Sequence, residues 1–400
     1  MSPAAWRALL AAGAGWMLDG MDVMLYALAL ETIRGEFHLT PAQSGAVFSS
    51  TLIAAAIGGG LSGLFADRFG RVRMLMVSIL IYSVCTALTA TSRSFTELLI
   101  WRALVGLGMG GEWSAGAVLV SEMWPAKLRG RAIGLMQSGF AIGYILAALL
   151  AALVIPQWGW RPLFVVGVAP ALMLVWIRRN VPEPEVWVKQ AEPSRGLTGA
   201  LPVLMKQPYA GRAAIATLSC TVLLCAYWGF FTWMPAYLAR PAPDGAGLGI
   251  LKSTGWIVAT QVGAFLGYAS FGFFADRFGR KLSFIAFVLG AAVVTPIYGL
   301  SARSPMTLML VGPFMGFFGH GYFSVFGAML AELFPSSVRA TAQGLCYNGG
   351  RAVSAVAPWS IGAMSSALGL GPTLGLTSLL YIVGAGLILM LPETRGKEIE

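Results

Sequence analysis

The sequence predicts an all-α membrane protein of twelve transmembrane helices, arranged as two related halves of six. Three observations predict this fold class: the composition, a series of apolar stretches and an internal repeat. Of the 400 residues, 57% are hydrophobic and only 11% are charged, and the mean hydropathy is +0.74. Soluble domains carry roughly 25% charged residues. A chain this poor in charge cannot cover a water-facing surface, so the composition excludes a soluble protein.

Apolar stretches long enough to cross a membrane recur along the whole chain. A helix needs about 20 apolar residues to cross a hydrocarbon core of about 30 Å. Strands of a membrane barrel would instead alternate apolar and polar residues over about 10 positions. The spans that we expect are 7–30, 43–65, 74–92, 96–121, 132–154, 161–179, 212–238, 253–275, 282–301, 306–331, 341–363 and 372–391.

The distribution of Lys and Arg predicts the orientation of these spans. Nineteen of the 27 Lys and Arg residues fall on the side that holds both termini and the loop after span 6. Six fall on the other side, and Arg102 and Arg351 lie inside spans. Because short cytoplasmic loops carry the excess of positive charge, we expect an inner (plasma) membrane protein with both termini in the cytoplasm. This topology accounts for the net charge of +10, so we expect no nucleic-acid partner.

Three motifs recur in the same order at nearly one offset. The segments Gly63–Arg71 and Gly272–Arg280 share seven consecutive identical residues 209 positions apart. The sequence Glu-x-x-Pro at Glu122 returns at Glu332, 210 positions later, and a Pro-Glu pair after span 6 returns after span 12. A fixed offset of this kind indicates duplicated halves.

The repeat divides the chain into two bundles and a linker. We expect an N-terminal six-helix bundle over 1–180 and a C-terminal six-helix bundle over 212–400. The segment 181–211 between them is rich in proline and mixed charge, which is typical of a linker, and we place it in the cytoplasm.

The loop Gly-x-x-x-Asp-Arg-x-Gly-Arg between spans 2 and 3, with its echo between spans 8 and 9, resembles the hallmark of the major facilitator superfamily. The resemblance covers essentially the whole chain. It implies twelve helices around a central cavity and transport by alternating access, in which the two halves rock about the substrate. Charges at these loops would latch one face of the protein in one conformation. The latch residues that we expect are Asp67, Arg68, Arg71, Glu122, Arg129, Asp276, Arg277, Arg280, Glu332 and Arg339.

Three local sequences narrow the resemblance. They are Leu18-Asp-Gly-Met-Asp22 in span 1, the glycine-rich stretch that ends in Glu112-Trp113 in span 4, and Pro182-Glu-Pro-Glu after span 6. Together they resemble the sialate:proton symporter family and the related aromatic acid:proton symporters and lactate permeases. That resemblance implies transport of a small organic carboxylate together with protons. Span 7 lacks the polar motif of the fungal lactate permeases, which argues against lactate itself.

Three acidic residues lie at membrane depth, where charge is costly and marks function. Asp19 and Asp22 lie three residues apart on one face of span 1, and Glu112 lies near the middle of span 4. Two carboxylates so close together should not both ionise readily. We expect one of these three acids to carry the proton, and the alternative is a structural ion pair with Arg102.

Arg351 is the candidate for holding the substrate carboxylate. It lies near the middle of span 11, and its repeat counterpart is Ala141, which argues against a shared scaffold role. A guanidinium stays charged and offers a planar fork that matches a carboxylate. Asn348 lies on the same face of the span. Two roles remain open for Arg102. It could act on the substrate or the proton, or it could pair two helices with each other.

Further polar and aromatic side chains are candidates for the substrate pocket. Gln137 and Tyr144 share one face of span 5, while Tyr227 and Gln261 lie in spans 7 and 8. His320 in span 10 could titrate near physiological pH, although a packing role is the alternative. We assign other aromatic residues, such as Trp228, to packing or interfacial anchoring. The four cysteines lie inside apolar spans without metal-like spacing, so we expect no metal site.

The function that these patterns favour is secondary active transport, in which a proton and a small organic carboxylate move together. A monocarboxylate, a sialate-like acid and an aromatic acid all remain open. The partners that we expect are that substrate, protons and the lipid bilayer. We expect no bound cofactor beyond the proton gradient, and a monomer. The alternatives are a sugar porter or an efflux carrier of the same superfamily. An enzyme is excluded because two His and four scattered Cys offer no catalytic constellation.

Overall fold

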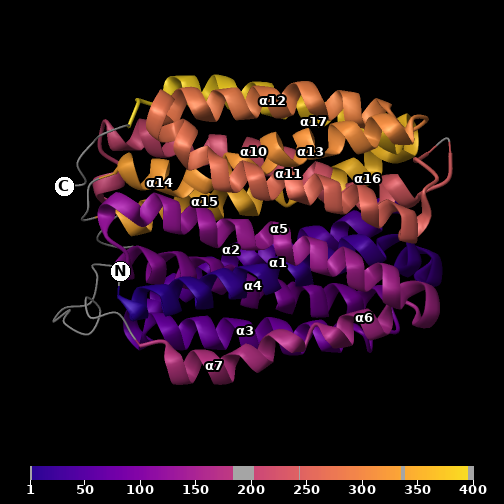
Figure 1. The fold of residues 1–400 in the computed structure, drawn as a ribbon, viewed down its shortest axis with the longest axis horizontal. Helices are drawn as coiled ribbons and strands as arrows, with labels where there is room; N and C mark the ends of the chain where they lie inside the picture. Colours follow the sequence, from indigo (N-terminus) through magenta and orange to yellow (C-terminus); the bar gives the residue numbers. More distant parts are fainter. Residues whose placement is uncertain (1, 183–201, 243, 335–337, 395–400) are drawn as a thin grey trace.

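A computed structural model describes residues 2–182, 202–242, 244–334 and 338–394, and every element longer than a turn in these ranges is a helix. The helices run roughly parallel to one long axis, and both termini lie at the same end, which we call the termini end (Figure 1). The elements are α1 (Pro3–Phe37), α2 (Pro41–Phe69), α3 (Arg71–Thr89), α4 (Phe95–Met123), α5 (Ala126–Trp158), α6 (Arg161–Val166), η1 (Ala169–Leu172), α7 (Met173–Asn180), α10 (Tyr209–Ala239), α11 (Gly249–Phe278), α12 (Arg280–Leu300), α13 (Pro305–Gly321), α14 (Phe323–Glu332), α15 (Arg339–Ser354), α16 (Val356–Leu368) and α17 (Leu370–Met390).

Local sequence signals set many helix ends. Ser2, Ser94 and Ser304 cap α1, α4 and α13, where each side-chain oxygen accepts a hydrogen bond from a backbone N–H in the first turn. Gly159 and Gly369 end α5 and α16 with φ of 75° and 81°, a conformation that other residues rarely adopt. The long apolar helices are therefore separated by short turns that the sequence itself specifies.

Eight helices among the described residues are long and apolar enough to cross a membrane. The other expected spans are α4 and three interrupted helices. These three are α6 with η1 and α7, α13 with α14, and α15 with α16. The sequence pattern did not predict the interruptions, because the apolar stretch continues across each of them. The twelve-span prediction and its all-α fold class are confirmed.

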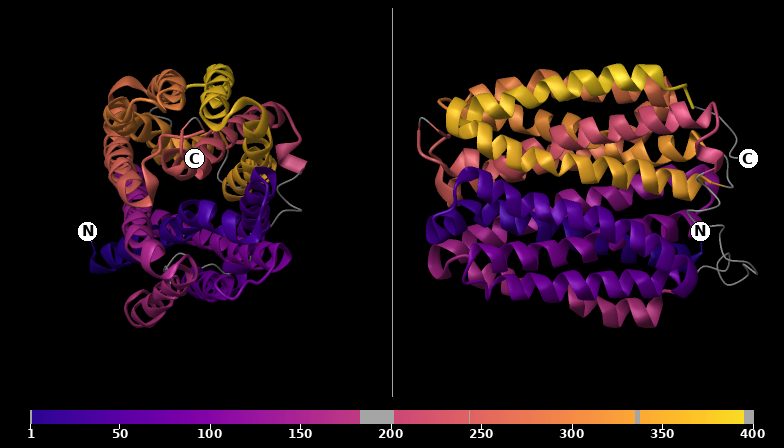
Figure 2. Two further views of the ribbon diagram at one scale, coloured as in Figure 1. Left: turned by 90° about the vertical axis from the view of Figure 1, so that its right-hand side faces the viewer. Right: turned by 180° about the vertical axis from the view of Figure 1, so that it is seen from behind.

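The two halves form separate layers. Helices α1–α7 lie in one layer and α10–α17 in the other (Figures 1 and 2). Within each layer, glycines let helices touch backbone to backbone. A Cβ added at Gly110 would overlap Ala55 on α2, and one added at Gly316 would overlap Thr260 on α11. Because lipid provides no hydrophobic force between helices, such close packing is a main source of stability in a membrane.

The two layers meet along a seam through the middle of the molecule. There α2 packs against α15 and α16, α5 against α11 and α14, and α1 against α10. At the end opposite the termini, Arg240 Nε donates to Glu31 Oε1 at 2.8 Å, and Nη2 lies 2.7 Å from the same oxygen. This ion pair fastens the end of α1 to the end of α10. The seam therefore holds the halves together at the end opposite the termini.

Candidate functional site

The centre of α1 carries two carboxyls at zero or nearly zero exposure. Asp19 is 3% exposed and Asp22 is fully buried. Arg102 of α4 is also fully buried, and its Nη1 lies 3.8 Å from Asp22 Oδ2. Aromatic rings complete the surroundings of this guanidinium, since its carbon lies 5.7 Å from the ring centre of Tyr26 and 6.0 Å from that of Phe164. Arg102 is thus enclosed in the N-terminal half as the partner of Asp22.

Glu112 lies close to the same face of α1. It is 2% exposed, and its carboxyl packs directly on Gly15, one turn before Asp19. The Tyr82 hydroxyl on α3 is its neighbour, and the charges of Glu112 and Asp19 act on each other. No hydrogen bond of regular geometry reaches either Glu112 carboxyl oxygen from the part of the chain that the structure describes. Three acids and one arginine therefore share one buried cluster in the N-terminal half.

Arg351 lies in the last turn of α15, at the break before α16. It is 5% exposed, its Nη2 is 3.4 Å from the Tyr347 hydroxyl, and its guanidinium lies over the Tyr347 ring at 4.9 Å. The arginine also lies within electrostatic reach of Asp19 across the seam. The helix break brings this cation to the boundary between the two halves.

A central cavity of about 30 Å³ lies at this boundary. Both halves line it, with side chains from α1, α5, α10, α11, α14 and α15. The lining residues are Trp16, Gln137, Phe140, Leu224, Tyr227, Trp228, Tyr268, Phe323, Tyr347 and Arg351. One guanidinium and one amide thus face a wall made mostly of aromatic rings.

The size of this cavity defines the conformation. It can hold a water molecule or two, whereas ligand sites for organic molecules are about 300–1,000 Å³. The halves must separate along the seam before an organic molecule can enter. The structure therefore shows a contracted state of the site.

The structure brings three of the predicted substrate residues to the cavity, namely Gln137, Tyr227 and Arg351. His320 lies behind the cavity wall, with its ring 5.1 Å from that of Tyr227 and 4.3 Å from that of Phe231. Asn348 packs on Gly59 of α2, one turn from Arg351.

The other two predicted pocket residues do not line the cavity. Tyr144 and Gln261 are fully buried, Tyr144 on α5 and Gln261 on α11. Both side-chain amide atoms of Gln261 lack a hydrogen-bond partner among the described residues. The roles of all the predicted site residues remain predictions.

Sequence reasoning missed most of the aromatic wall. Trp228 was assigned to packing or anchoring, but it lines the cavity. Trp16 and Tyr347 were not singled out, although Trp16 precedes Asp19 by three residues and Tyr347 precedes Arg351 by four. These spacings put each ring on the same helix face as the neighbouring charge. The signal was therefore present, but aromatic residues are too common in this chain for it to stand out.

At the termini end, the described part of the expected latch lies in the C-terminal half. Arg280 Nη2 is 3.4 Å from Glu332 Oε1, and Thr394 donates to Glu332 at 2.5 Å. Arg277 is exposed. The side chains of Asp67, Arg68, Arg71, Glu122, Arg129, Asp276 and Arg339 lie outside the described residues.

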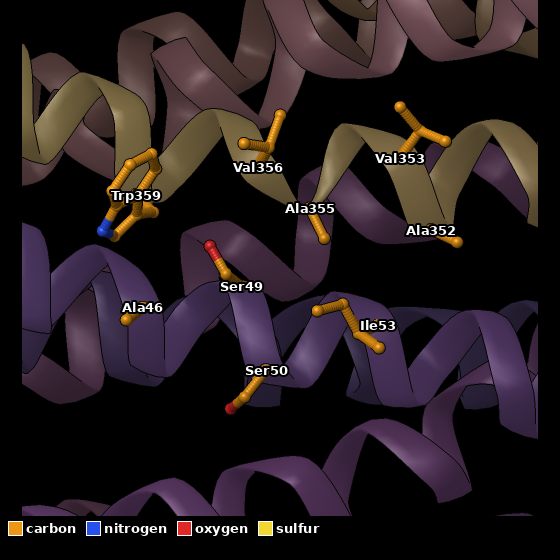
Figure 3. A pocket seen from close by; sticks show the side chains of 9 residues that line it. All are labelled: Ala46, Ser49, Ser50, Ile53, Ala352, Val353, Ala355, Val356 and Trp359. Atoms are coloured by element: carbon orange, nitrogen blue, oxygen red, sulfur yellow. The ribbon is translucent and has the colours of Figure 1, made fainter.

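A larger cavity of about 400 Å³ lies beside the seam, between α2 and the α15–α16 pair (Figure 3). Its lining includes no charged residue, and Ile53, Val353 and Trp359 are about half exposed. An uncharged, half-exposed lining of this kind offers no group that would bind an anion. The charged and aromatic central cavity, although smaller, is the candidate substrate site.

Comparison with known proteins identifies the family of this chain. The model of the Major Facilitator Superfamily matches residues 12–242 and 242–399. The chain belongs to the major facilitator superfamily. It is therefore a membrane transporter and not an enzyme.

A solved structure of the xylose transporter XylE from E. coli, in a partially occluded inward-open conformation, superposes with a TM-score of 0.80 over 99% of this chain and 100% of that one. At 19% identity, this similarity shows the superfamily fold alone.

Two relatives within the superfamily are more similar in sequence. The cis,cis-muconate transport protein of Acinetobacter baylyi is 34% identical over 92% of this chain and 90% of its own length. The sialic acid transporter NanX of Escherichia coli is 30% identical over 95% of this chain and 92% of its own. These relatives confirm the resemblance to sialate and organic-acid carriers.

Proposed function

We propose that this protein imports a small organic carboxylate together with a proton, by alternating access of its two halves. The observation that carries the proposal is Arg351, a buried guanidinium in an aromatic cavity at the seam, with three acids on the facing half. A guanidinium at membrane depth is costly unless it binds an anion. Relatives that carry muconate and sialic acid support an anionic substrate.

The aromatic wall favours a planar unsaturated or aromatic acid. Trp16, Phe140 and Tyr227 from opposite halves can close on the two faces of a flat ring while Arg351 binds its carboxylate. Gln137 offers one further polar contact. Benzoate is the simplest acid that combines one carboxylate with one aromatic ring, and it is therefore the probe that we choose.

Proton coupling follows from the energetics of anion entry. A membrane potential that is negative inside opposes the entry of an anion by about 2.3 kcal/mol per charge for each 100 mV. A proton that moves with the anion removes this cost. Asp19, Asp22 and Glu112 are the carboxyls that can take the proton, and the transporter then needs no bound cofactor.

The location that we propose is the inner membrane of a bacterium, with both termini in the cytoplasm. The excess of Lys and Arg on the termini side supports this orientation. In this orientation the Glu31–Arg240 pair closes the periplasmic entrance.

The test is a thermal-stability screen of the purified protein against small acids and uncharged sugars at acid and neutral pH. We expect benzoate or a related acid to raise the unfolding temperature of the wild type. The same acid should have at least about thirtyfold lower affinity for Arg351→Ala, since truncating one partner of a buried charge pair costs 2 kcal/mol or more. Arg303→Ala, an exposed arginine of the same half, is the matched control.

Two results would overturn the proposal. Stabilisation by sugars alone would replace the carboxylate site with that of a sugar porter. Stabilisation by an acid that is equally strong in Arg351→Ala would remove Arg351 from the binding site.

A further inference from the structure

We propose that Gln261 of α11, together with Tyr144 of α5, determines which acids the transporter accepts. The two side chains bind an uncharged hydrogen-bonding group at the end of the substrate away from its carboxylate. This inference rests on the proposed function and deepens it, because it assigns a second contact to the same substrate.

Gln261 and Tyr144 carry polar atoms that the folded chain leaves without partners. Both side chains are fully buried. Neither the amide oxygen nor the amide nitrogen of Gln261 has a hydrogen-bond partner among the described residues, and the same holds for the Tyr144 hydroxyl. A buried polar group without a hydrogen bond is costly, and an apolar side chain of similar size would pack there without that cost. The unpartnered amide and hydroxyl therefore point to a ligand that pairs with them.

Two contacts set the register of α5 against α11 along the seam. Thr254 Oγ1 donates to the carbonyl oxygen of Ala148 at 3.4 Å. A Cβ added at Gly134 would lie 3.6 Å from the carbonyl oxygen of Tyr268. The two contact points are 14 residues apart on each helix and run in opposite directions along the chain. The helices are therefore antiparallel, and each residue between these points can be matched with its neighbour on the other helix.

This register brings Gln261 and Tyr144 close together. Gln261 is level with Ala141, because each lies midway between the two contact points on its helix. Tyr144 follows Ala141 by three residues, so it lies on the same face of α5, one turn away. The short side chain of Ala141 leaves room for the amide of Gln261 opposite it. The two unpartnered groups thus come from opposite halves and lie within one helical turn of each other along the seam.

The pair adjoins the central cavity. Gln137 and Tyr268 line the cavity, and each lies seven residues from its partner on the same helix, Tyr144 and Gln261 respectively. Seven residues are two turns, so the pair lies roughly 10 Å from the cavity level, toward the end opposite the termini. Separation of the halves along the α5–α11 seam uncovers both side chains. An acid held by Arg351 at the cavity level can then extend along the seam to this pair.

The chemistry of the pair selects an uncharged group. An amide and a phenol can each donate and accept a hydrogen bond, which suits a hydroxyl or a carbonyl. A second carboxylate would need a second cation at this depth. Among the described residues, the buried arginines and lysines are Arg102, which faces Asp22, and Arg351, which binds the first carboxylate. The preferred acid therefore combines one carboxylate with one uncharged polar group.

The experiment is calorimetric titration of the full-length purified protein at neutral pH with three probes of one shape. The probes are benzoate, 4-hydroxybenzoate and the dicarboxylate terephthalate. The wild type should bind 4-hydroxybenzoate about tenfold more tightly than benzoate, which is the factor that one further hydrogen bond supplies. Terephthalate should bind no more tightly than benzoate, because its second carboxylate loses water without gaining a cation.

Three variants test the assignment to these residues. Gln261→Met keeps a side chain of similar length but removes both polar atoms, so it should bind 4-hydroxybenzoate no better than benzoate while its affinity for benzoate is unchanged. Tyr144→Phe removes a single oxygen and should reduce the preference for the hydroxylated acid about threefold. The matched control is Tyr237→Phe. It removes a buried hydroxyl that donates to the carbonyl of Gly299 at 2.8 Å, away from the cavity lining, and it should keep the full preference.

The outcomes separate this inference from the proposed function. If the wild type binds none of the three acids or their relatives, the proposed function fails. If the wild type binds benzoate and 4-hydroxybenzoate equally, or binds terephthalate most tightly, this inference fails and the proposed function stands. The same holds if Gln261→Met keeps the tenfold preference. In case Gln261→Met does not fold, an unchanged preference in Tyr144→Phe overturns the inference.

Discussion

Removal of Asp22 should destabilise the protein more than removal of its partner Arg102. Both side chains are fully buried, with 3.8 Å between their closest charged atoms. Asp22→Asn leaves a guanidinium that cannot lose its charge, whereas Arg102→Met leaves a carboxyl that can take up a proton. Breaking a buried pair from one side costs about 3–5 kcal/mol. We expect the lower end for Asp22→Asn, because Asp19 also lies within electrostatic reach of Arg102.

The double variant Asp22→Asn/Arg102→Met isolates the interaction itself. Replacing both members of a buried pair is often neutral, so the double variant should recover at least about 2 kcal/mol of the loss in Asp22→Asn. The assay is thermal unfolding of the purified variants followed by intrinsic fluorescence. A cost of 3 kcal/mol lowers the midpoint by about 6–12 °C for bundles of this size.

The matched control is the exposed pair of Glu36 and Arg161, whose side chains are both 40% exposed. Glu36→Gln should cost less than about 1 kcal/mol, because water screens an exposed pair. If Asp22→Asn is no worse than Glu36→Gln, or if the double variant loses the sum of both single losses, the buried pair does not hold α1 to α4 as described.

Three further predictions concern the seam, the helix packing and the cavity. Glu31→Gln should weaken the closure opposite the termini, so a cysteine placed at Trp228 in a cysteine-free background should react faster with a thiol reagent. An unchanged reaction rate would show that the ion pair does not hold the halves together. Gly143→Ala should lower the yield of folded protein, because its Cβ would overlap Met17 on α1, whereas the Cβ of Gly255→Ala meets only open space and should be tolerated. Size-exclusion chromatography compares the two yields, and equal yields would refute the packing argument. Phe140→Ala should weaken benzoate binding by about tenfold through loss of a ring contact of about 1–1.5 kcal/mol, measured by calorimetry, and unaltered affinity would place the ring of the substrate elsewhere.

The membrane fold could be predicted because its causes are local. Each span must satisfy its own backbone hydrogen bonds in lipid, so a stretch of about 20 apolar residues is sufficient evidence for a helix. The duplicated loops at Gly63–Arg71 and Gly272–Arg280 then indicated two halves. The interruption after Ser354 had a local signal, because Pro358 has no N–H to donate to the carbonyl of Ser354. The interruption after Gly321 has no proline at this position relative to it, and it could not be predicted from the sequence.

The candidate site was only partly predictable. Charged residues are rare at membrane depth. The sequence alone therefore sufficed to select Asp19, Asp22, Glu112, Arg102 and Arg351. Their partners depend on how helices far apart in the chain pack. Arg102 and Arg351 could have exchanged roles on sequence grounds, and only the structure places Arg102 with Asp22 and Arg351 in the aromatic cavity.

The sequence by itself therefore determined the class of protein, its spans, its duplicated halves and the short set of buried charges, because each depends on residues close together in the chain or on an exact repeat. Only the tertiary structure decided which of these charges meet. Electrostatic interaction in a low-dielectric interior depends steeply on separation and burial. Arg102 meets Asp22 within one half, whereas Arg351 lines a cavity to which both halves contribute side chains, and this difference is a property of the folded chain alone.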